Sequence, residues 1–148
     1  MTNILEAGSL LTEIQQQVPS LPATIFVNSP LFIGVVREGI SGQTLKQIVD
    51  LVALKSVFER LFETSPSNLS RYYTKKKLSG LQTEAVLDLC RLFLGAVSAL
   101  GDLEKARGWM QSRLIVLGDE SPESFCDTFE GRKLVAEQLR KIGSGEFV

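Results

Sequence analysis

Ser-Pro dipeptides interrupt this chain at three positions, Ser29-Pro30, Ser65-Pro66 and Ser121-Pro122. Serine favours the N-cap of a helix, and proline favours the first helical position, where its fixed φ suits the helix and an N–H would have no partner. Glycine follows several apolar segments, as at Gly39 and Gly101, and glycine is common where helices end. These signals predict a chain of short helices.

Apolar residues recur at helical spacing between most of these signals, so we expect an all-α fold. The segment 23–28, ATIFVN, is the exception, because its residues favour β structure; we expect a short strand or an extended linker there. The expected helices are 4–18, Ser29 to Gly39, 41–52, 56–63 with Ser56 as its cap, a helix opened by Pro66, 83–100, a helix capped by Asp102, a short helix opened by Pro122, and a last helix from Thr128 or Phe129 to Gly143.

Composition excludes several classes of function. The chain has 148 residues, a net charge of −1 and no histidine, so histidine-based acid–base catalysis and histidine-ligated metal sites are excluded. The cysteines Cys90 and Cys126 fit no metal or redox spacing, and Cys90 lies in an apolar helix pattern typical of a buried thiol. No P-loop, GxSxG or GxGxxG motif occurs. We therefore expect no enzyme activity, catalytic residue, metal or cofactor.

Neither the acidic residues nor the N-terminus changes these expectations: the former do not indicate an enzyme, and the latter does not indicate export. Asp102, Glu104, Asp119, Glu120 and Glu123 are the one plausible acidic cluster, but most of them suit caps and first helical turns. No apolar run approaches the roughly 20 residues that cross a bilayer. The N-terminus lacks a basic region and a cleavage site, so we expect a cytoplasmic protein that does not bind membranes.

A basic stretch contrasts with the rest of the chain. From Thr64 to Thr83 there are four basic side chains and no acid. At 100° per residue, Leu69, Tyr72 and Tyr73 share one side of a helix, which leaves a short polar face outward. With helix 56–63 before it, this is the outline of a helix-turn-helix without the usual turn glycine. The alternatives are a DNA-binding face or a merely solvated surface, and the residues concerned are Ser67, Asn68, Ser70, Arg71, Thr74, Lys75, Lys76 and Lys77.

The expected helix 83–100 carries apolar residues on more than one side. Its main stripe includes Val86 and Phe93, while Leu87 and Leu94 lie well round from it. Such a helix is buried on two sides, either because it joins two subdomains or because it meets a second subunit. We therefore name Leu87 and Leu94 as candidate dimer-interface residues, with ordinary core packing as the alternative.

The last third of the chain resembles a known family. The resemblance rests on Gly101-Asp102, Glu104-Lys105-Ala106, Trp109-Met110, Leu117-Gly118, Ser121-Pro122, Phe125, Thr128, Gly131, Val135, Leu139, Ile142, Gly145 and Phe147. This spacing is similar to the toxin-binding domain of Xre/MbcA/ParS-type antitoxins. Residues upstream resemble the helix-turn-helix half of the same family, so the resemblance covers about residues 35–148. The family usually has Pro-Asn where this chain has Ser112-Arg113.

The resemblance implies a type II antitoxin that binds a cognate RES-domain toxin, occludes its active site and represses the shared promoter by binding operator DNA. It also implies a homodimer within a larger toxin–antitoxin complex. The corresponding segments are an N-terminal extension (1–34), a helix-turn-helix-like region (35–82) and a toxin-binding domain (83–148), joined by a long central helix. Implied toxin contacts are Trp109, Arg113, Leu117 and the tail Gly145, Glu146, Phe147 and Val148. The alternative is a stand-alone helix-turn-helix regulator with a helical dimerisation domain.

Overall fold

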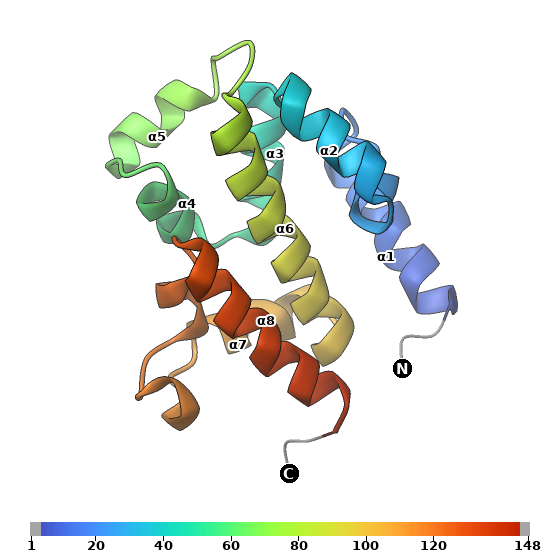
Figure 1. Cartoon of the computed structure of the whole chain (residues 1–148), viewed down its shortest axis with the longest axis vertical. Helices are drawn as coiled ribbons and strands as arrows, with labels where there is room; N and C mark the ends of the chain where they lie inside the picture. The colour runs from blue at the N-terminus through green and yellow to red at the C-terminus, as the bar shows by residue number, and fades with distance from the viewer. Residues whose placement is uncertain (1–3, 146–148) are drawn as a thin grey trace.

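The computed structural model describes the backbone of residues 4–145 and the side chains of residues 10–145, and all of its regular elements are helices (Figure 1). This confirms the predicted all-α class. One isolated bridge, between Leu114 and Glu120, is the only β pairing in the described chain. The α-helices are α1 (Ile4–Gln17), α2 (Ser29–Glu38), α3 (Gly42–Val52), α4 (Lys55–Leu61), α5 (Pro66–Tyr72), α6 (Gly80–Leu100), α7 (Leu103–Gln111) and α8 (Phe129–Gly143), and the 3-10 helices are η1 (Ala23–Val27), η2 (Ile115–Leu117) and η3 (Pro122–Phe125).

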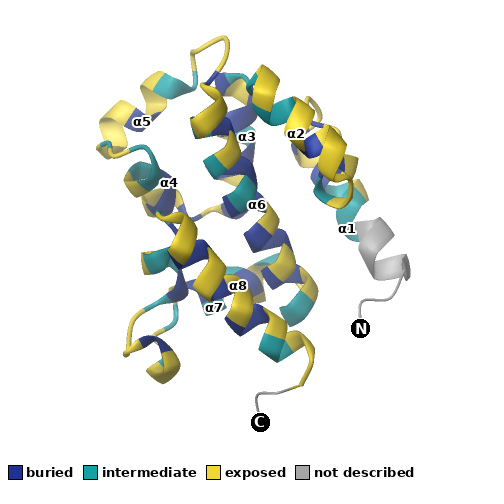
Figure 2. Cartoon of the chain, viewed as in Figure 1, coloured by how far each residue is buried: buried dark blue, intermediate teal, exposed yellow. Residues whose placement is uncertain are grey.

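Helix α6 runs through the centre of the molecule, with α1 to α3 on one side and α7 and α8 on the other (Figures 1 and 2). It starts at Gly80, three residues before the predicted start, because Ser79 and Gln82 form a capping box there. Its buried residues face several directions, so neighbouring helices cover most of its circumference. They are Thr83, Val86, Leu87, Leu89, Cys90, Leu92, Phe93, Leu94, Ala96 and Val97.

Leu87 and Leu94 belong to this intramolecular core. Leu87 has no exposed surface and Leu94 keeps 7% of its own, so neither offers an apolar patch to a second subunit. The prediction of a dimer interface at these two leucines is therefore wrong. The spacing of apolar residues correctly predicted that these leucines lie on a second side of the helix, but that side packs against other parts of the same chain.

The described part of the N-terminal segment also contributes to this core. Ile14, Val18, Leu21, Ile25 and Phe32 are all buried in the same apolar cluster as the residues of α6. The predicted boundary at 34/35 falls inside α2, and the boundary at 82/83 falls inside α6. One contiguous core therefore connects the three segments.

Two helix starts follow from the predicted caps Asp102 and Thr128, whereas α2 and α4 begin differently, and Ser65 and Ser121 make no side-chain cap hydrogen bond. The side chains of Asp102 and Thr128 accept hydrogen bonds from the backbone N–H groups of Lys105 and Gly131, as expected of caps. Asn28 rather than Ser29 caps α2, through a bond from the N–H of Leu31. Helix α4 starts at Lys55, so Ser56 is not its cap.

The segment 23–28 was expected to be a strand or linker, and both expectations are wrong. Residues Ala23–Val27 form the 3-10 helix η1, which packs against α1 and α2. Ala23 and Ile25 are buried, and the Gln15 side chain accepts a hydrogen bond from the N–H of Ala23. Tertiary burial of these two residues outweighs the β preference of the individual side chains.

Two arginines connect the N-terminal helices to the C-terminal third. Arg107 on α7 donates to the carbonyl oxygens of Leu51 and Val52 at the end of α3, at 2.6 and 3.2 Å. Arg60 on α4 donates to the carbonyl oxygen of Glu123 in η3, at 2.6 Å. Positive charge near a helix C-terminus is favourable, because the last carbonyl groups lack helical partners. No helix in the described range 4–145 is long and apolar enough to cross a membrane.

Both cysteines should resist alkylation in the folded protein. Burial raises the pKa of the Cys90 thiol to about 12, and burial likewise raises the pKa of Cys126 to about 12. The thiolate is the reactive form, so at pH 8 the native protein should react with a thiol reagent at a rate set by unfolding. Mass spectrometry should find no adduct in native buffer and two in denaturant. Rapid labelling of Cys90 or Cys126 in native buffer would contradict this burial.

Candidate functional site

The predicted DNA-binding stretch forms two short helices, α4 and α5, joined by residues 62–65. Glu63 in this connection has a φ of 51°, in the left-handed region that favours glycine. The turn therefore adopts a conformation typical of a glycine, although the sequence has none there. The Phe62 and Tyr72 rings lie 4.6 Å apart, which packs the connection against the end of α5.

The two sides of α5 are arranged as the helical projection predicts. Leu69 is fully buried, and Tyr72 and Tyr73 are half-buried. The opposite side faces solvent at the upper end of the molecule (Figure 2). Helix α5 ends at Tyr72, so Thr74 lies in the turn that follows rather than on the helix. All eight predicted DNA contacts are exposed: Ser67, Asn68, Ser70, Arg71, Thr74, Lys75, Lys76 and Lys77.

The hydroxyl groups on this face already donate hydrogen bonds locally. Ser70 donates to the carbonyl oxygen of Ser67 at 2.9 Å, and Thr74 donates to that of Arg71 at 3.0 Å. Their oxygen lone pairs stay open to an outside donor. The side chain of Arg71 is a charged donor on the same surface, so the face offers both acceptors and donors.

The three lysines of the basic loop, residues 75–77, have different surroundings. The ammonium of Lys75 lies 5.0 Å from the centre of the Tyr72 ring, as a cation–π contact. Lys77 lies 3.4 Å from Glu38, but both side chains are more than half exposed, so this ion pair is weak. Lys76 makes no ion pair with any described residue.

Backbone contacts fix the position of the basic loop. The N–H of Gly42 donates to the carbonyl of Lys75 at 2.9 Å, and the N–H of Leu78 donates to that of Ile40 at 2.8 Å. A Cβ on Gly42 would collide with the backbone of Tyr72 and Tyr73, so only glycine fits there. The lysines therefore extend from a loop whose path is set by its buried neighbours.

A second candidate site is an apolar groove between α7 and α8 with a volume of about 690 Å³. Two predicted toxin contacts, Trp109 and Arg113, line it, with Trp109 half-buried and Arg113 exposed. Leu117 does not, because its side chain is buried, so the prediction of Leu117 as a surface contact is wrong. Gly145 is exposed, whereas Glu146, Phe147 and Val148 lie outside the described residues. The groove residues that the sequence analysis missed are Leu114, Ile115, Val116, Gln138 and Ile142.

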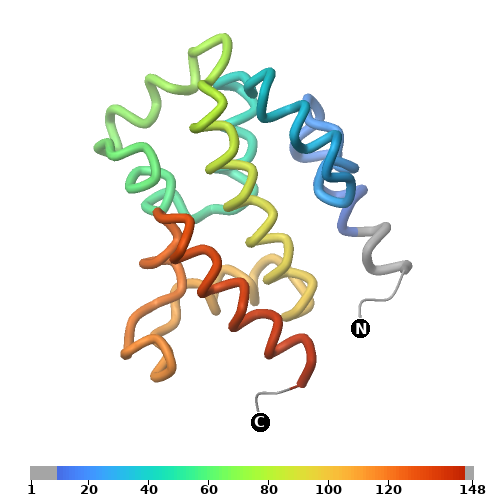
Figure 3. The backbone as a smooth tube through the Cα atoms, viewed as in Figure 1, coloured from blue at the N-terminus to red at the C-terminus, as the bar shows by residue number. Residues whose placement is uncertain are grey.

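The loop between α7 and α8 projects from the lower end of the molecule (Figure 3). At its tip Ile115 is 93% exposed and Val116 is 55% exposed. The loop is closed by hydrogen bonds from the N–H groups of Leu114 to Glu120 and of Asp119 to Leu114, at 3.1 and 2.9 Å. An Ile-Val pair outside any helical period is the signal from which this site could have been found. Folding leaves these two apolar side chains in water.

Gln138 forms part of the groove floor. Only 5% of its surface is exposed, and its side-chain oxygen Oε1 has no hydrogen-bond partner in the described chain. Most buried acceptors in proteins are paired, so this one is unusual. It lies on α8 one helical turn before Ile142, at the i, i+4 spacing that places both on one face.

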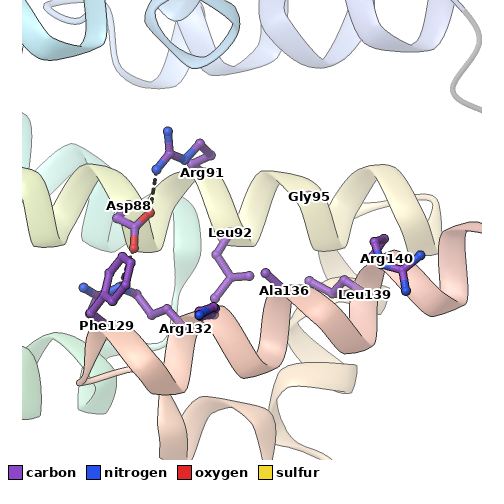
Figure 4. A pocket seen from close by; sticks show the side chains of 10 residues that line it. Asp88, Arg91, Leu92, Gly95, Phe129, Arg132, Ala136, Leu139 and Arg140 are labelled. Atoms are coloured by element: carbon purple, nitrogen blue, oxygen red, sulfur yellow. Dashed lines mark hydrogen bonds and ion pairs between the residues drawn. The ribbon is translucent and has the colours of Figure 1, made fainter. Parts of the chain in front are cut away.

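A separate pocket of about 360 Å³ lies between α6 and α8 (Figure 4). Its one carboxylate, Asp88, accepts hydrogen bonds from Arg132 and Arg91, both at 2.7 Å. Burial alone would raise the pKa of Asp88, but these two guanidinium groups hold it below its ordinary value. Arg132 is buried and also donates to the carbonyl of Cys126 at 3.1 Å. A carboxylate held between two cations acts as a structural link between α6 and α8.

The comparisons with known proteins agree with the resemblance found in the sequence. Residues 93–145 match the family of the antitoxin Xre/MbcA/ParS C-terminal toxin-binding domain. The chain is also 26% identical, over 97% of its own length and 98% of the relative, to the "Prs ADP-ribosylating antitoxin" of Sphingobium sp. (strain YBL2). These matches support the predicted resemblance to Xre/MbcA/ParS-type antitoxins: residues 93–145 match the toxin-binding domain of the family, and the relative is similar over nearly the whole chain. The groove between α7 and α8 lies within the matched residues.

Removing the charge of Asp88 should destabilise the protein. In Asp88→Asn, the buried Arg132 loses its anionic acceptor, which should cost roughly 1.5–3 kcal/mol at pH 7. The folded-state pKa of Asp88 is lowered, so its stabilisation is present above the unfolded pKa of about 4 and is lost as pH falls through the folded pKa. Urea unfolding from pH 7 to pH 3 should show the difference from wild type shrinking at low pH.

Asp50→Asn is the matched control for this measurement. Asp50 pairs with Lys46 at 2.8 Å on the surface of α3, with both side chains more than half exposed. Its removal should change the free energy of unfolding by less than about 0.5 kcal/mol. Equal effects of the two variants would contradict a structural role for the Asp88–Arg132 pair.

Proposed function

We propose that this antitoxin neutralises a RES-domain toxin by binding it directly and covering its active site, and that it represses its own promoter. The observation that carries the proposal is the position of an apolar groove with exposed walls inside the segment that matches a toxin-binding domain. The name of the Sphingobium relative associates an antitoxin with ADP-ribosylation, which supports a toxin that transfers ADP-ribose.

The promoter-binding part of the proposal rests on α5 and the basic loop. Their exposed residues carry donors and acceptors suited to base edges, and lysines suited to phosphates. The loop between α7 and α8, whose residues line the groove, lies towards the opposite end of the long axis from α5 (Figure 1). DNA and toxin can therefore bind the same chain together. Operator half-sites are usually bound by dimers, so we propose a homodimer on DNA.

The toxin test uses the protein encoded by the gene beside the one for this chain, which the proposal expects to carry a RES domain. Expression of that protein should stop growth, and co-expression of the antitoxin should restore growth and give a complex that purifies as one species. The alternative, a stand-alone regulator, would bind promoter DNA but would neither restore growth nor form a complex. That outcome would overturn the antitoxin assignment for this gene pair.

The tail should contribute to toxin affinity. Gly145 has a φ of 74°, in the region that favours glycine, and Glu146, Phe147 and Val148 follow it in the sequence. We propose that Phe147 enters an apolar pocket of the toxin and that Glu146 or the terminal carboxylate meets cationic groups there. Burying a phenylalanine stabilises by roughly 1.5–3 kcal/mol, so a chain ending at Gly143 should bind about 10- to 100-fold more weakly. Unchanged affinity and full neutralisation would show that the tail is idle.

DNA binding should depend on Arg71 and on the basic loop in different ways. Arg71→Ala should cost about 1–3 kcal/mol on the native promoter and reduce the preference for it over other DNA. Alanine at Lys75, Lys76 and Lys77 together should lower the salt slope by about one unit for each phosphate that the variant no longer neutralises. Of the single variants, Lys76→Ala should change the slope most, because Lys75 lies on Tyr72 and Lys77 faces Glu38.

A salt series by fluorescence anisotropy measures these effects. Lys46→Ala is the matched control, because Lys46 is an exposed lysine on α3 that already pairs with Asp50. If wild type, Arg71→Ala and the triple lysine variant bind equally at every salt concentration, the basic surface is merely solvated and the DNA-binding proposal is wrong.

A further inference from the structure

We propose that the groove between α7 and α8 binds an apolar segment of the toxin that brings a hydrogen-bond donor to the buried side-chain oxygen of Gln138. This inference rests on the proposed function, because it takes the groove as part of the toxin contact. It adds the chemistry of the toxin segment: aliphatic or aromatic side chains, together with an N–H or O–H group that reaches the groove floor.

The unpaired oxygen of Gln138 carries the inference. Gln138 is 95% buried by the folding of this chain alone, and Oε1 receives no hydrogen bond from any described residue. Because Oε1 itself has almost no accessible surface, the side chain must rotate towards the groove before a donor of the toxin can reach it. A buried acceptor without a donor destabilises the protein that contains it. Leucine or methionine would fill the same space without this cost, so an amide here serves something outside the described chain.

The walls of the groove define what else the partner must present. Trp109 and Ile142 form apolar sides, and the projecting loop adds Ile115 and Val116. Tryptophan is common among residues that dominate binding energy, and apolar anchors surround such residues in protein interfaces. The loop is closed by its own backbone hydrogen bonds, so these side chains are held in place before a partner arrives.

The rim adds one electrostatic preference. Arg113 lines the groove and has only a 3.9 Å contact with Asp119, in which both side chains are more than two-thirds exposed. Such a pair is weak in water, so Arg113 can take a carboxylate of the partner instead. The expected toxin segment is therefore apolar, carries a hydrogen-bond donor and is flanked by an acidic residue.

Two substitutions test the inference by calorimetric titration against the RES-domain protein that the proposed function expects to be encoded beside the gene. Ile115→Ser should weaken binding about tenfold or more without changing thermal unfolding, because this side chain is 93% exposed in the free antitoxin. Gln138→Met should also weaken binding, while it leaves the free antitoxin equally or more stable, because an unpaired buried acceptor has been replaced by an apolar group.

Gln138→Met is expected to weaken toxin binding without lowering the stability of the free antitoxin, and this combination distinguishes a binding role of the amide from a structural one. If Gln138→Met lowers both the unfolding temperature and the affinity, the amide supports the fold and the inferred hydrogen bond is wrong. If Ile115→Ser binds as tightly as wild type, the groove is not the contact and the inference is overturned. Leu81→Ser and Leu134→Ser are the matched controls, since both leucines are exposed and neither lines the groove. Both should bind like wild type.

Two further measurements distinguish other occupants of the groove. In a chain that ends at Gly145, the two substitutions should still weaken toxin binding; loss of their effects would mean that the groove holds this chain's own last residues. Sedimentation should show the same mass for wild type and Ile115→Ser; a lower mass in the variant would mean that the groove holds a second copy. Either result overturns the toxin-segment inference.

If wild type itself fails to bind the RES-domain protein, the proposed function is wrong. If wild type binds and the substitutions leave the affinity unchanged, only the inference about the groove is wrong.

Discussion

Burial of α6 on most of its circumference is the constraint on which the rest of this structure depends. A helix that is apolar on most of its sides must be covered on those sides. Here the N-terminal helices cover one part of α6, and α7 and α8 cover another (Figure 1). The segment that includes α5 and the segment that forms the groove therefore share one core.

Arginine side chains reinforce this arrangement at three points. Arg60 and Arg107 donate to backbone carbonyl groups across the junction between the N-terminal helices and the C-terminal third. Arg132 links Asp88 on α6 to the carbonyl of Cys126, at the base of α8. The planar guanidinium can donate several hydrogen bonds in fixed directions, which lysine cannot. These directional hydrogen bonds help to fix how the helices are oriented, which apolar packing alone does not do because it is not directional.

Much of the fold could be predicted from the sequence, because its main signals are local. Caps such as Asp102 and Thr128 act within one helical turn, so spacing and residue type were sufficient to place their helices. The errors arose where tertiary contacts decide the outcome. The β-favouring residues near Ile25 form a 3-10 helix because burial against neighbouring helices is worth more than their preference. Helical projection placed Leu87 on a second apolar side, but projection does not say whether that side meets the same chain or another.

The candidate surfaces divide in the same way. The outward face of α5 was predictable, because the helical period fixes which residues share a side. The groove was not, since it joins Trp109 to Ile115 and Gln138, which no single period relates. Its position relative to α5 follows from α6, which runs between the two ends of the molecule (Figure 1).

A toxin on the groove can change the DNA affinity of the same chain only if it alters the packing of the shared core or adds charge near the DNA. Because one contiguous core connects the two surfaces, a toxin that shifted this packing would also shift the DNA-binding face of the same chain. A toxin that held several chains on neighbouring half-sites would add a second route, because linked binding raises the effective concentration.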